Sequence, residues 1–386
     1  MLSNNIFIKN FKKKKTPEKL KRLYKNLISE SSNKQSLLNS FTKSFSYSFD
    51  KKKISKFKKY STFQVYGMGG SSLGAKAIYD FLNTKIKKNF YFFDNLDAKN
   101  KKIKKNKKTL SIIISKSGNT LETIVNENIF SSKNKLYITE AGNNYLRNLA
   151  KKLKSDIVDH KNFIGGRYSV LSDVGMLPAE LMGLNINKFK RFNNLIFNKK
   201  FVNNLLLSVI SIYHLVRAKK TNSIILNYDE SSSSLFRWYQ QLVAESLGKK
   251  SNGVLPIISD MPKDNHSLMQ LYLDGNKNCF FTFFDVFEKN SPKISEKKIF
   301  DNLKYLKKHN LQSIKLAQKE ATKNVFKAKK IPFRSFEVLK KNEETLGELF
   351  TFFMLETILL GKMMRVNPFD QPAVELIKKE TKKILI

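Results

Sequence analysis

The feature that most constrains the fold of this 386-residue chain is an alternation of short β-rich runs with longer helical patterns. Strands separated by helical segments of this length are typical of βαβ units, which build a parallel sheet. We therefore expect a first α/β unit that ends near Gly165 and Gly166, where the pattern breaks. Its expected strands are residues 62–66, 90–93, 110–115, 135–139 and 156–159, and its clearest helices are 73–82 and 121–130.

The alternation resumes after a helical stretch at 201–218 and predicts a second parallel-sheet unit. The predicted fold class is therefore α/β, with two sheets that are each flanked by helices. The second unit has expected strands at 223–228, 254–259 and 279–285, and expected helices at 235–247, 266–273, 297–326 and 344–364. The predicted parts are an amino-terminal helical segment (1–60), the first unit (61–190), the second unit (191–365) and a carboxyl-terminal helical segment (366–386). We expect this last segment to complete the active site whose residues are described below.

The charge of the chain raises the question of a nucleic-acid partner. There are 72 Lys and Arg against 32 Asp and Glu, a formal charge of +40 that attracts anions through its long-range field. The lysines recur along the whole chain, for example at 51–53 and 382–383, instead of collecting in one tail. A surface that reads phosphates usually also recruits arginine. We interpret the lysines as solvated faces and expect no specific nucleic-acid partner.

Cysteine usage and hydropathy indicate a soluble cytoplasmic protein. Cys279 is the only cysteine, so no internal disulfide can form, and its apolar run at 279–284 places it in a core. The apolar stretch at 6–8 is too short for a secretory signal. Glu356 interrupts the most apolar segment, 349–360, so we expect no membrane span and no membrane partner.

A first glycine-rich turn, Gly-Met-Gly-Gly-Ser-Ser-Leu-Gly at 67–74, follows a predicted strand and opens a predicted helix. Glycines there let backbone N–H groups approach an anion at the helix N-terminus, where the helix dipole also favours negative charge. A dinucleotide fingerprint would need a third glycine where Ser72 stands, although Asp94 could imitate its ribose ligand. A tight turn without any ligand is the plain alternative.

A second turn, Ser-Lys-Ser-Gly-Asn-Thr-Leu-Glu-Thr, begins at Ser115 and again joins a strand to a helix. The hydroxyls of Ser115, Ser117 and Thr120 can surround a phosphate monoester together with backbone amides. Both turns would lie at the same edge of one parallel sheet. We therefore predict that Ser71 and these three hydroxyls hold one phosphate. A helix cap by Asn119 or Thr120 is an alternative that is compatible with binding.

Together with four further blocks, the two turns resemble those of phosphoglucose isomerases, in the same order and from about residue 62 to 380. The first turn is similar to the family's glycine-serine loop, and the second to its serine-lysine-hydroxyl phosphate loop. The further blocks are Gly-Gly-Arg-Tyr-Ser-Val-Leu-Ser at 165–172, Glu-Ser-Leu-Gly-Lys at 245–249, Asp-Asn-His-Ser at 264–267 and Asn-Pro-Phe-Asp-Gln-Pro-Ala-Val-Glu at 367–375.

This resemblance implies two sugar-isomerase (SIS) subdomains, usually in a homodimer with the site at the subunit interface. It also implies a reversible aldose-ketose isomerisation of glucose 6-phosphate and fructose 6-phosphate through an enediolate, in glycolysis and gluconeogenesis. No cofactor and no metal are expected, because the chemistry needs none and no ligand cluster has metal spacing.

The resemblance further implies the roles of individual residues. Glu245 corresponds to the base that moves the proton between C2 and C1, and Arg167 to the cation that stabilises the enediolate. His266 corresponds to the ring-opening histidine and Lys378 to the lysine of the same step. For Glu245 and Arg167, a plain surface role is the alternative. The implied substrate-binding residues are Gly70, Ser71, Ser115, Lys116, Ser117, Thr120 and Gln371.

Two departures from the family pattern leave alternatives open. Ile377 stands where the family has glycine before Lys378, and the Ser-Gly-Asn-Thr sequence resembles bacterial and bifunctional phosphoglucose/phosphomannose isomerases. A bifunctional isomerase is therefore one alternative. A non-catalytic sugar-phosphate-binding protein is another, although Glu245, Arg167 and His266 together argue against it.

Overall fold

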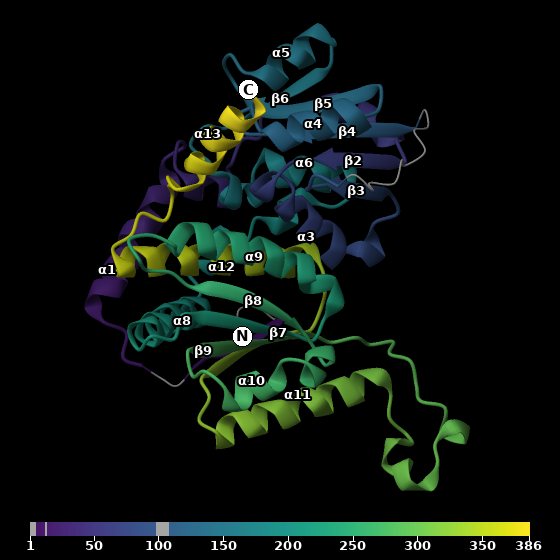
Figure 1. The fold of residues 1–386 in the computed structure, drawn as a ribbon, viewed down its shortest axis with the longest axis vertical. Helices are drawn as coiled ribbons and strands as arrows, with labels where there is room; N and C mark the ends of the chain where they lie inside the picture. Colours follow the sequence, from purple (N-terminus) through teal and green to yellow (C-terminus); the bar gives the residue numbers. More distant parts are fainter. Residues whose placement is uncertain (1–4, 12–13, 98–107) are drawn as a thin grey trace.

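The computed structural model describes residues 5–11, 14–97 and 108–386. Figure 1 shows two α/β units, one above the other along the longest axis of the molecule. A continuous apolar core runs through both units, because residues of each sheet, such as Phe63 and Phe336, belong to one buried cluster. Helix α3 of the first unit packs against α9 of the second, so the units form one compact structure.

The first sheet has the strand order β3-β2-β4-β5-β6, and all its strand pairs are parallel. Its central strands are buried on both faces, which is typical of parallel sheets covered by helices. Each of the five strands lies within one residue of its predicted bounds. The strands are β2 (Thr62–Tyr66), β3 (Asn89–Phe93), β4 (Thr109–Ile114), β5 (Asn134–Glu140) and β6 (Asp156–His160), and the helices are α3 (Leu73–Phe81), α4 (Leu121–Phe130), α5 (Tyr145–Lys152) and α6 (Asp173–Leu181).

The second sheet has the order β1-β10-β9-β7-β8. Strand β1 is antiparallel to β10 and comes from the amino-terminal residues, while the other pairs are parallel. The sequence patterns predicted β7, β8 and β9 but missed β1 and β10. The strands are β1 (Ile6–Lys9), β7 (Asn222–Asn227), β8 (Leu255–Asp260), β9 (Cys279–Val286) and β10 (Phe333–Val338), and the helices are α8 (Lys199–Arg217), α9 (Ser233–Leu247), α10 (Met269–Asp274), α11 (Leu311–Ala328) and α12 (Glu343–Met364).

Two helix predictions in the second unit were wrong in part. The predicted helix at 266–273 begins only at Met269, because Asp264 accepts hydrogen bonds from the amide of Asp260 and from Ser267 Oγ and folds this segment into a turn. The predicted helical stretch at 297–326 contains two 3-10 turns before α11 (Leu311–Ala328), which starts at the capping box of Asn310 and Ser313.

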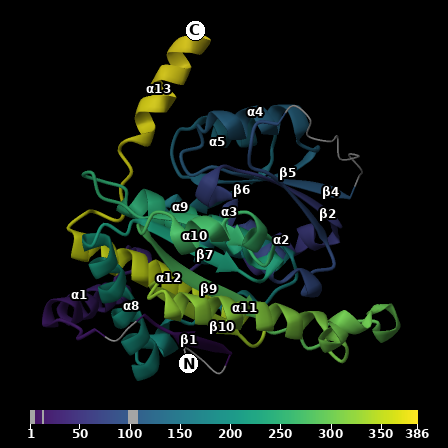
Figure 2. The same cartoon turned by 60° about the horizontal axis from the view of Figure 1, so that its bottom comes forward.

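The remaining helices frame these units. Helix α12 is buried along almost its whole length, including its glutamates Glu348 and Glu356. Helix α13 projects from the body in Figure 2, and none of its residues is buried. These other helices are α1 (Glu18–Ser29), α2 (Lys51–Ser55), α7 (Phe192–Leu195) and α13 (Val374–Leu385).

Membrane-spanning potential is limited to one bent segment. No single helix of the described residues is long and apolar enough to cross a membrane. The pair Ile186–Leu195 and Lys199–Arg217 passes such a test only when joined, across a bend of 82°. Cys279, expected in a core, is partly buried against the smaller apolar cluster of the second unit.

Candidate active site

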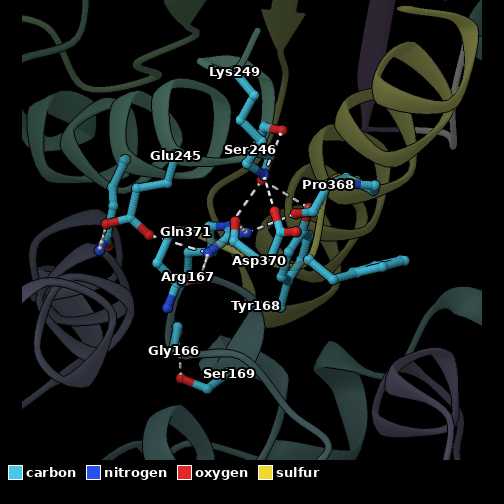
Figure 3. A network of polar contacts seen from close by, with 12 residues as sticks. Gly166, Arg167, Tyr168, Ser169, Glu245, Ser246, Lys249, Pro368, Asp370 and Gln371 are labelled. Atoms are coloured by element: carbon cyan, nitrogen blue, oxygen red, sulfur yellow. Dashed lines mark hydrogen bonds and ion pairs between the residues drawn. The ribbon is translucent and has the colours of Figure 1, made fainter. Parts of the chain in front are cut away.

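Arg167 is the centre of a network of polar contacts between the two units (Figure 3). It lies in the 3-10 turn η6 (Gly166–Leu171), and its side chain is only 1% exposed. All five of its N–H groups have acceptors, which fixes both the position and the orientation of the guanidinium. The acceptors are Ser246 Oγ (2.8 Å), Glu245 Oε2 (3.2 Å), Gln371 Oε1 (2.7 Å) and the carbonyl oxygens of Pro368 (2.7 Å) and Asp370 (3.0 Å).

Glu245 lies in the last turn of α9 and remains accessible, with 30% of its side chain exposed. Its Oε2 accepts from Arg167, and its Oε1 accepts from Gln241 Nε2 at 2.8 Å. Gln241 lies one helical turn before Glu245, so both side chains point to the same side of the helix. The carboxylate is therefore held at both oxygens while one side of it stays open.

The first glycine turn approaches this centre through its backbone. Gly70, in the 3-10 turn η4 (Gly69–Ser71), lies so close to Gly166 that an added Cβ would come within 2.1 Å of the Gly166 carbonyl carbon. Gly69 has a φ of +54°, and a Cβ there would meet Gln241 Nε2 at 2.6 Å. Only glycine fits at these two positions. The turn that was predicted to bind phosphate thus lies against Arg167 and next to the Gln241–Glu245 pair.

The segment that follows α12 covers the polar network of Arg167 on the side away from the glycine turn. Lys249 Nζ donates to the carbonyl oxygens of Ser246 (3.1 Å) and Asn367 and forms a 2.9 Å ion pair with Asp370. The hydrogen bond from Lys249 holds the pKa of the Asp370 carboxyl below its usual range. Tyr168 Oη contributes by bonding Ser246 Oγ at 2.8 Å. These contacts place the backbone carbonyls and Gln371 around Arg167.

The second turn follows β4, which pairs directly with β2, so the two turns lie at neighbouring strand ends as predicted. The hydroxyls of Ser115 and Thr120 are 2.8 Å apart. Ser117 Oγ accepts from the amide of Asn119 at 3.3 Å. Lys116 turns aside, donating to the Asn162 carbonyl at 2.7 Å. The structure thus brings the hydroxyls of Ser115 and Thr120 together but ties Lys116 to a neighbouring loop.

Helix capping does not account for the hydroxyls of the second turn. Thr120 occupies the N-cap position of α4, but its side chain makes no capping hydrogen bond. The side-chain oxygen of Asn119 accepts instead from the amide of Tyr145 at 3.0 Å. The N-terminal amides of α4 therefore lie beside hydroxyls that do not cap them. The capping alternative for these two residues is wrong in this structure.

His266 is not brought to Glu245 within one chain. It lies in the 3-10 turn η9 (Lys263–His266), near the beginning of α9, where Ser233 Oγ donates to Asp260 Oδ1 at 3.4 Å. Glu245 lies twelve residues after Ser233 on the same helix, about 18 Å further along its axis at 1.5 Å per residue. The two predicted catalytic groups therefore lie near opposite ends of α9.

Lys378 is also separate from the centre. It lies on the exposed helix α13, where its ammonium pairs with Glu375 at 2.6 Å and 66% of its side chain is exposed. Gln371, seven residues earlier, is the only predicted residue of this carboxyl-terminal segment that contacts Arg167 among the described residues. Of the four implied catalytic residues, the structure brings together Arg167 and Glu245.

Several residues of the centre were not predicted. Tyr168, Ser246 and Lys249 lie inside the sequence blocks quoted above, yet no role had been given to them. Gln241 lies outside the blocks, and its spacing of four residues before Glu245 on a predicted helix was the available signal. Among the described residues, no group of three or more His, Cys, Asp or Glu side chains is arranged to hold a metal ion.

The family model described as phosphoglucose isomerase matches residues 12–386. A glucose-6-phosphate isomerase of Methanocaldococcus jannaschii is 34% identical over 340 residues, which cover 83% of this chain and 83% of that protein. One from Mycoplasmopsis pulmonis is 33% identical over 349 residues, covering 83% and 82%. The crystal structure of a glucose-6-phosphate isomerase from Chlamydia trachomatis shares the fold, with a TM-score of 0.71, 19% identity and coverage of 87% and 72%.

Proposed function

The chain belongs to the phosphoglucose isomerase family, and on this premise we propose that it interconverts glucose 6-phosphate and fructose 6-phosphate with Glu245 as the base. It is an aldose-ketose isomerase built on two SIS subdomains. The observation that carries the role of Glu245 is its accessible carboxylate, held at one oxygen by a buried arginine beside the glycine turn at 69–71.

The proposed reaction moves one proton between adjacent carbons. Glu245 takes the proton from C2 of the open-chain aldose, leaving an enediolate, and returns it to C1 while the C2 oxygen becomes the ketose carbonyl. The hydroxyl proton moves from O2 to O1, so atoms balance without a redox partner. The hydrogen bond from Gln241 fixes the rotamer of the carboxylate, which keeps its open side toward the substrate.

The proposed role of Arg167 rests on its hydrogen bonds, because each of its N–H groups already has an acceptor. Because all five N–H groups are already bonded, we propose that the guanidinium stabilises the enediolate chiefly by its fixed positive charge. A charge that is buried and held in place needs little reorganisation during the reaction. The same charge orients Glu245, so its removal would affect both the anionic intermediate and the base.

The phosphate is proposed to bind at the two turns. The hydroxyls of Ser71, Ser115, Ser117 and Thr120 and the backbone around Gly70 lie at neighbouring carboxyl ends of β2 and β4. A dianion there would accept hydroxyl and amide hydrogen bonds at the beginning of α4, where the helix dipole favours negative charge. Lys116 adds a nearby positive charge if it leaves the carbonyl of Asn162.

A homodimer would explain the position of His266. Since His266 lies in a turn near the beginning of α9 and Glu245 in the last turn of that helix, we propose that His266 acts in ring opening on the substrate bound by a second subunit. Lys378 would reach a substrate only after α13 packs against the body or against a second copy. We further propose that the enzyme works in the cytoplasm, in glycolysis and gluconeogenesis.

The activity is tested by a coupled assay that follows glucose 6-phosphate formed from fructose 6-phosphate, with mannose 6-phosphate as the comparison substrate. We expect conversion of fructose 6-phosphate in the presence of a chelator and without nucleotide. Equal rates on mannose 6-phosphate would favour the bifunctional alternative, and no turnover of either sugar would contradict the proposal.

Sharing of the site between subunits is tested by mixing two inactive variants, Glu245→Gln and His266→Ala, after dissociation. If His266 serves the partner's site, mixed dimers contain one site with both intact residues, and part of the activity returns. Absence of recovery in a sample shown by sedimentation to contain mixed dimers would contradict the shared site. The isomerase assignment itself would be unaffected.

A further inference from the structure

A large cavity lies at the β1 edge of the second sheet, and none of its lining residues belongs to the catalytic centre. It has a volume of about 660 Å³, which is within the usual range for small-molecule sites. It is lined by residues at the end of β1 and just after it, at the end of α8 and in the turn between α11 and β10. Figure 2 labels these four elements. We call it the edge cavity.

The charged residues of the edge cavity are all basic. Its lining includes Lys9, Lys14, Lys327 and Lys330, and no carboxylate is among its described lining residues. Lys327 donates to Asn324 Oδ1 and lies in the last turn of α11, where a cation is ordinary. The ammonium groups of the other three lysines make no hydrogen bond or ion pair with any described residue. These three charges favour an anionic group.

The body of the edge cavity is apolar. Phe11, Leu215, Ile331 and Phe333 line it, together with Pro332. An inorganic anion would leave this surface in contact with water. The walls therefore favour an anion that also carries a flat or bulky apolar part.

Two residues that line the edge cavity, Asn10 and Ser211, carry buried oxygen atoms without hydrogen-bond partners. Ser211 is 3% exposed, and its Oγ has no hydrogen-bond partner. Asn10 Oδ1 is likewise unpaired, while its amide nitrogen is fixed by a 2.8 Å hydrogen bond to the Asn204 carbonyl. An amide oxygen only accepts, so a ligand N–H or O–H group that reached Asn10 Oδ1 would satisfy it. An acyl chain would leave both atoms unsatisfied.

We infer that the edge cavity binds a nucleoside phosphate. Its base has apolar faces for the phenylalanine-rich walls and N–H groups for Asn10 and Ser211, and its phosphates suit the three unpaired lysines. This ligand satisfies the three features of the cavity together, whereas inorganic phosphate or a fatty acid satisfies one or two. The site is independent of the catalytic residues.

The test is calorimetric titration of the full-length protein with ADP, in buffer with added salt and saturating fructose 6-phosphate to occupy the catalytic site. We expect one ADP per chain. The double variant Lys14→Glu/Lys330→Glu should weaken binding at least tenfold. The matched control Lys19→Glu/Lys34→Glu makes the same charge change at exposed positions and should change affinity less than twofold.

Two further measurements identify the ligand class. Ser211→Ala removes the buried hydroxyl and should weaken ADP several-fold while leaving pyrophosphate unaffected. Pyrophosphate and decanoate should each bind much more weakly than ADP. Equal affinity for pyrophosphate would show that the lysines attract any anion, and tighter binding of decanoate would show a lipid site. Either result, no ADP binding, or equal weakening by the control variant would overturn the inference.

Discussion

Two buried arginines, Arg167 and Arg334, pair with glutamates in very different surroundings. Arg334 contacts both carboxylate oxygens of Glu356, which is 2% exposed, and also bonds Ser208 Oγ and Thr282 Oγ1. Arg167 is buried to the same degree, but its glutamate is 30% exposed. The Arg334–Glu356 pair is sealed inside the second unit, whereas the Arg167–Glu245 pair lies beside the glycine turn at 69–71, one of the two turns proposed to bind phosphate.

We propose that this difference separates a structural ion pair, Arg334–Glu356, from a reactive one, Arg167–Glu245. A sealed pair must keep both charges, since removing one leaves the other buried and uncompensated. In the Arg167–Glu245 pair, two backbone carbonyls and Gln371 accept hydrogen bonds from three of the five arginine N–H groups. The carboxylate of Glu245 is therefore free to exchange a proton with a ligand. Substitution of the two glutamates should therefore have opposite consequences.

The largest expected effect is on catalysis by Glu245→Gln. The amide keeps the shape and the contact with Arg167 but cannot take a proton, so kcat should fall by about 10²- to 10⁴-fold. The temperature of unfolding should stay close to that of the wild type. Steady-state kinetics and thermal unfolding of the same preparation check both statements. If Glu245→Gln also unfolds at a lower temperature, Glu245 is a structural partner of its arginine, as Glu356 is.

The second expected effect is on stability, in the variant Glu356→Gln. This change leaves Arg334 charged and unpaired inside the protein, so the free energy of unfolding should fall by about 3–5 kcal/mol. Activity per folded molecule should be nearly unchanged. Urea unfolding measures the loss, with Glu245→Gln as the matched control. If Glu356→Gln leaves the urea midpoint unchanged, or lowers kcat without lowering stability, the contrast drawn between the two ion pairs is wrong.

A third effect concerns the ligand that the open pair faces. Replacing Ser115 and Thr120 together with alanine removes two hydroxyls proposed to bond the phosphate dianion, and KM should rise about tenfold or more. The control is Ser29→Ala/Ser32→Ala, which removes exposed hydroxyls bonded only to local carbonyls. If KM is the same in both variants and the folded fraction is intact, the phosphate does not bind at the second turn.

The last expected effect is a pH dependence of stability, and it comes from Lys190, a buried lysine without a carboxylate ion pair among the described residues. Its ammonium donates to the carbonyls of Ser40 and Leu171 and lies 4.8 Å from the ring centre of Phe45. Burial lowers the pKa of Lys190 to about 7, although Asp173 opposes this shift. A lowered folded-state pKa means that stability from this residue is present above about pH 10.5 and is lost as pH falls toward 7.

The variant Lys190→Met should therefore reduce the rise in unfolding free energy between pH 7 and pH 10. Denaturant unfolding at several pH values measures the slope in variant and wild type. Asp173 acts in a different window, because burial raises the pKa of its carboxyl to about 6 and its stabilisation is lost as pH rises through that value. An unchanged slope above pH 7 would show that Lys190 stays protonated on folding.

Much of the fold could be predicted, because the parallel strands are short, continuous and apolar. The five strands of the first sheet follow directly from this pattern. Strands β1 and β10 were missed because Ile6–Lys9 and Phe333–Val338 contain charged residues and lie at or beside the sheet edge, where the apolar pattern weakens. The four-part division at 60, 190 and 365 stays a prediction.

The site could be predicted only where local sequence determines it. The two turns and Glu245 stand out through glycines, hydroxyls and ordered blocks, and the structure brings Glu245 to Arg167. Contacts between distant segments, such as Lys249 with Asp370, depend on packing that spacing does not reveal. The distance between His266 and Glu245 is likewise a property of the folded helix α9.

The account depends most directly on proton transfer by Glu245. The measurement is exchange of the C2 hydrogen of glucose 6-phosphate with solvent deuterium, followed by NMR in wild type and in Glu245→Gln at equal folded concentration. We predict ready exchange in the wild type and a decrease of at least about 10²-fold in the variant, with sugar-phosphate affinity little changed. Exchange at the wild-type rate in Glu245→Gln would contradict the account, because another group would then be the base.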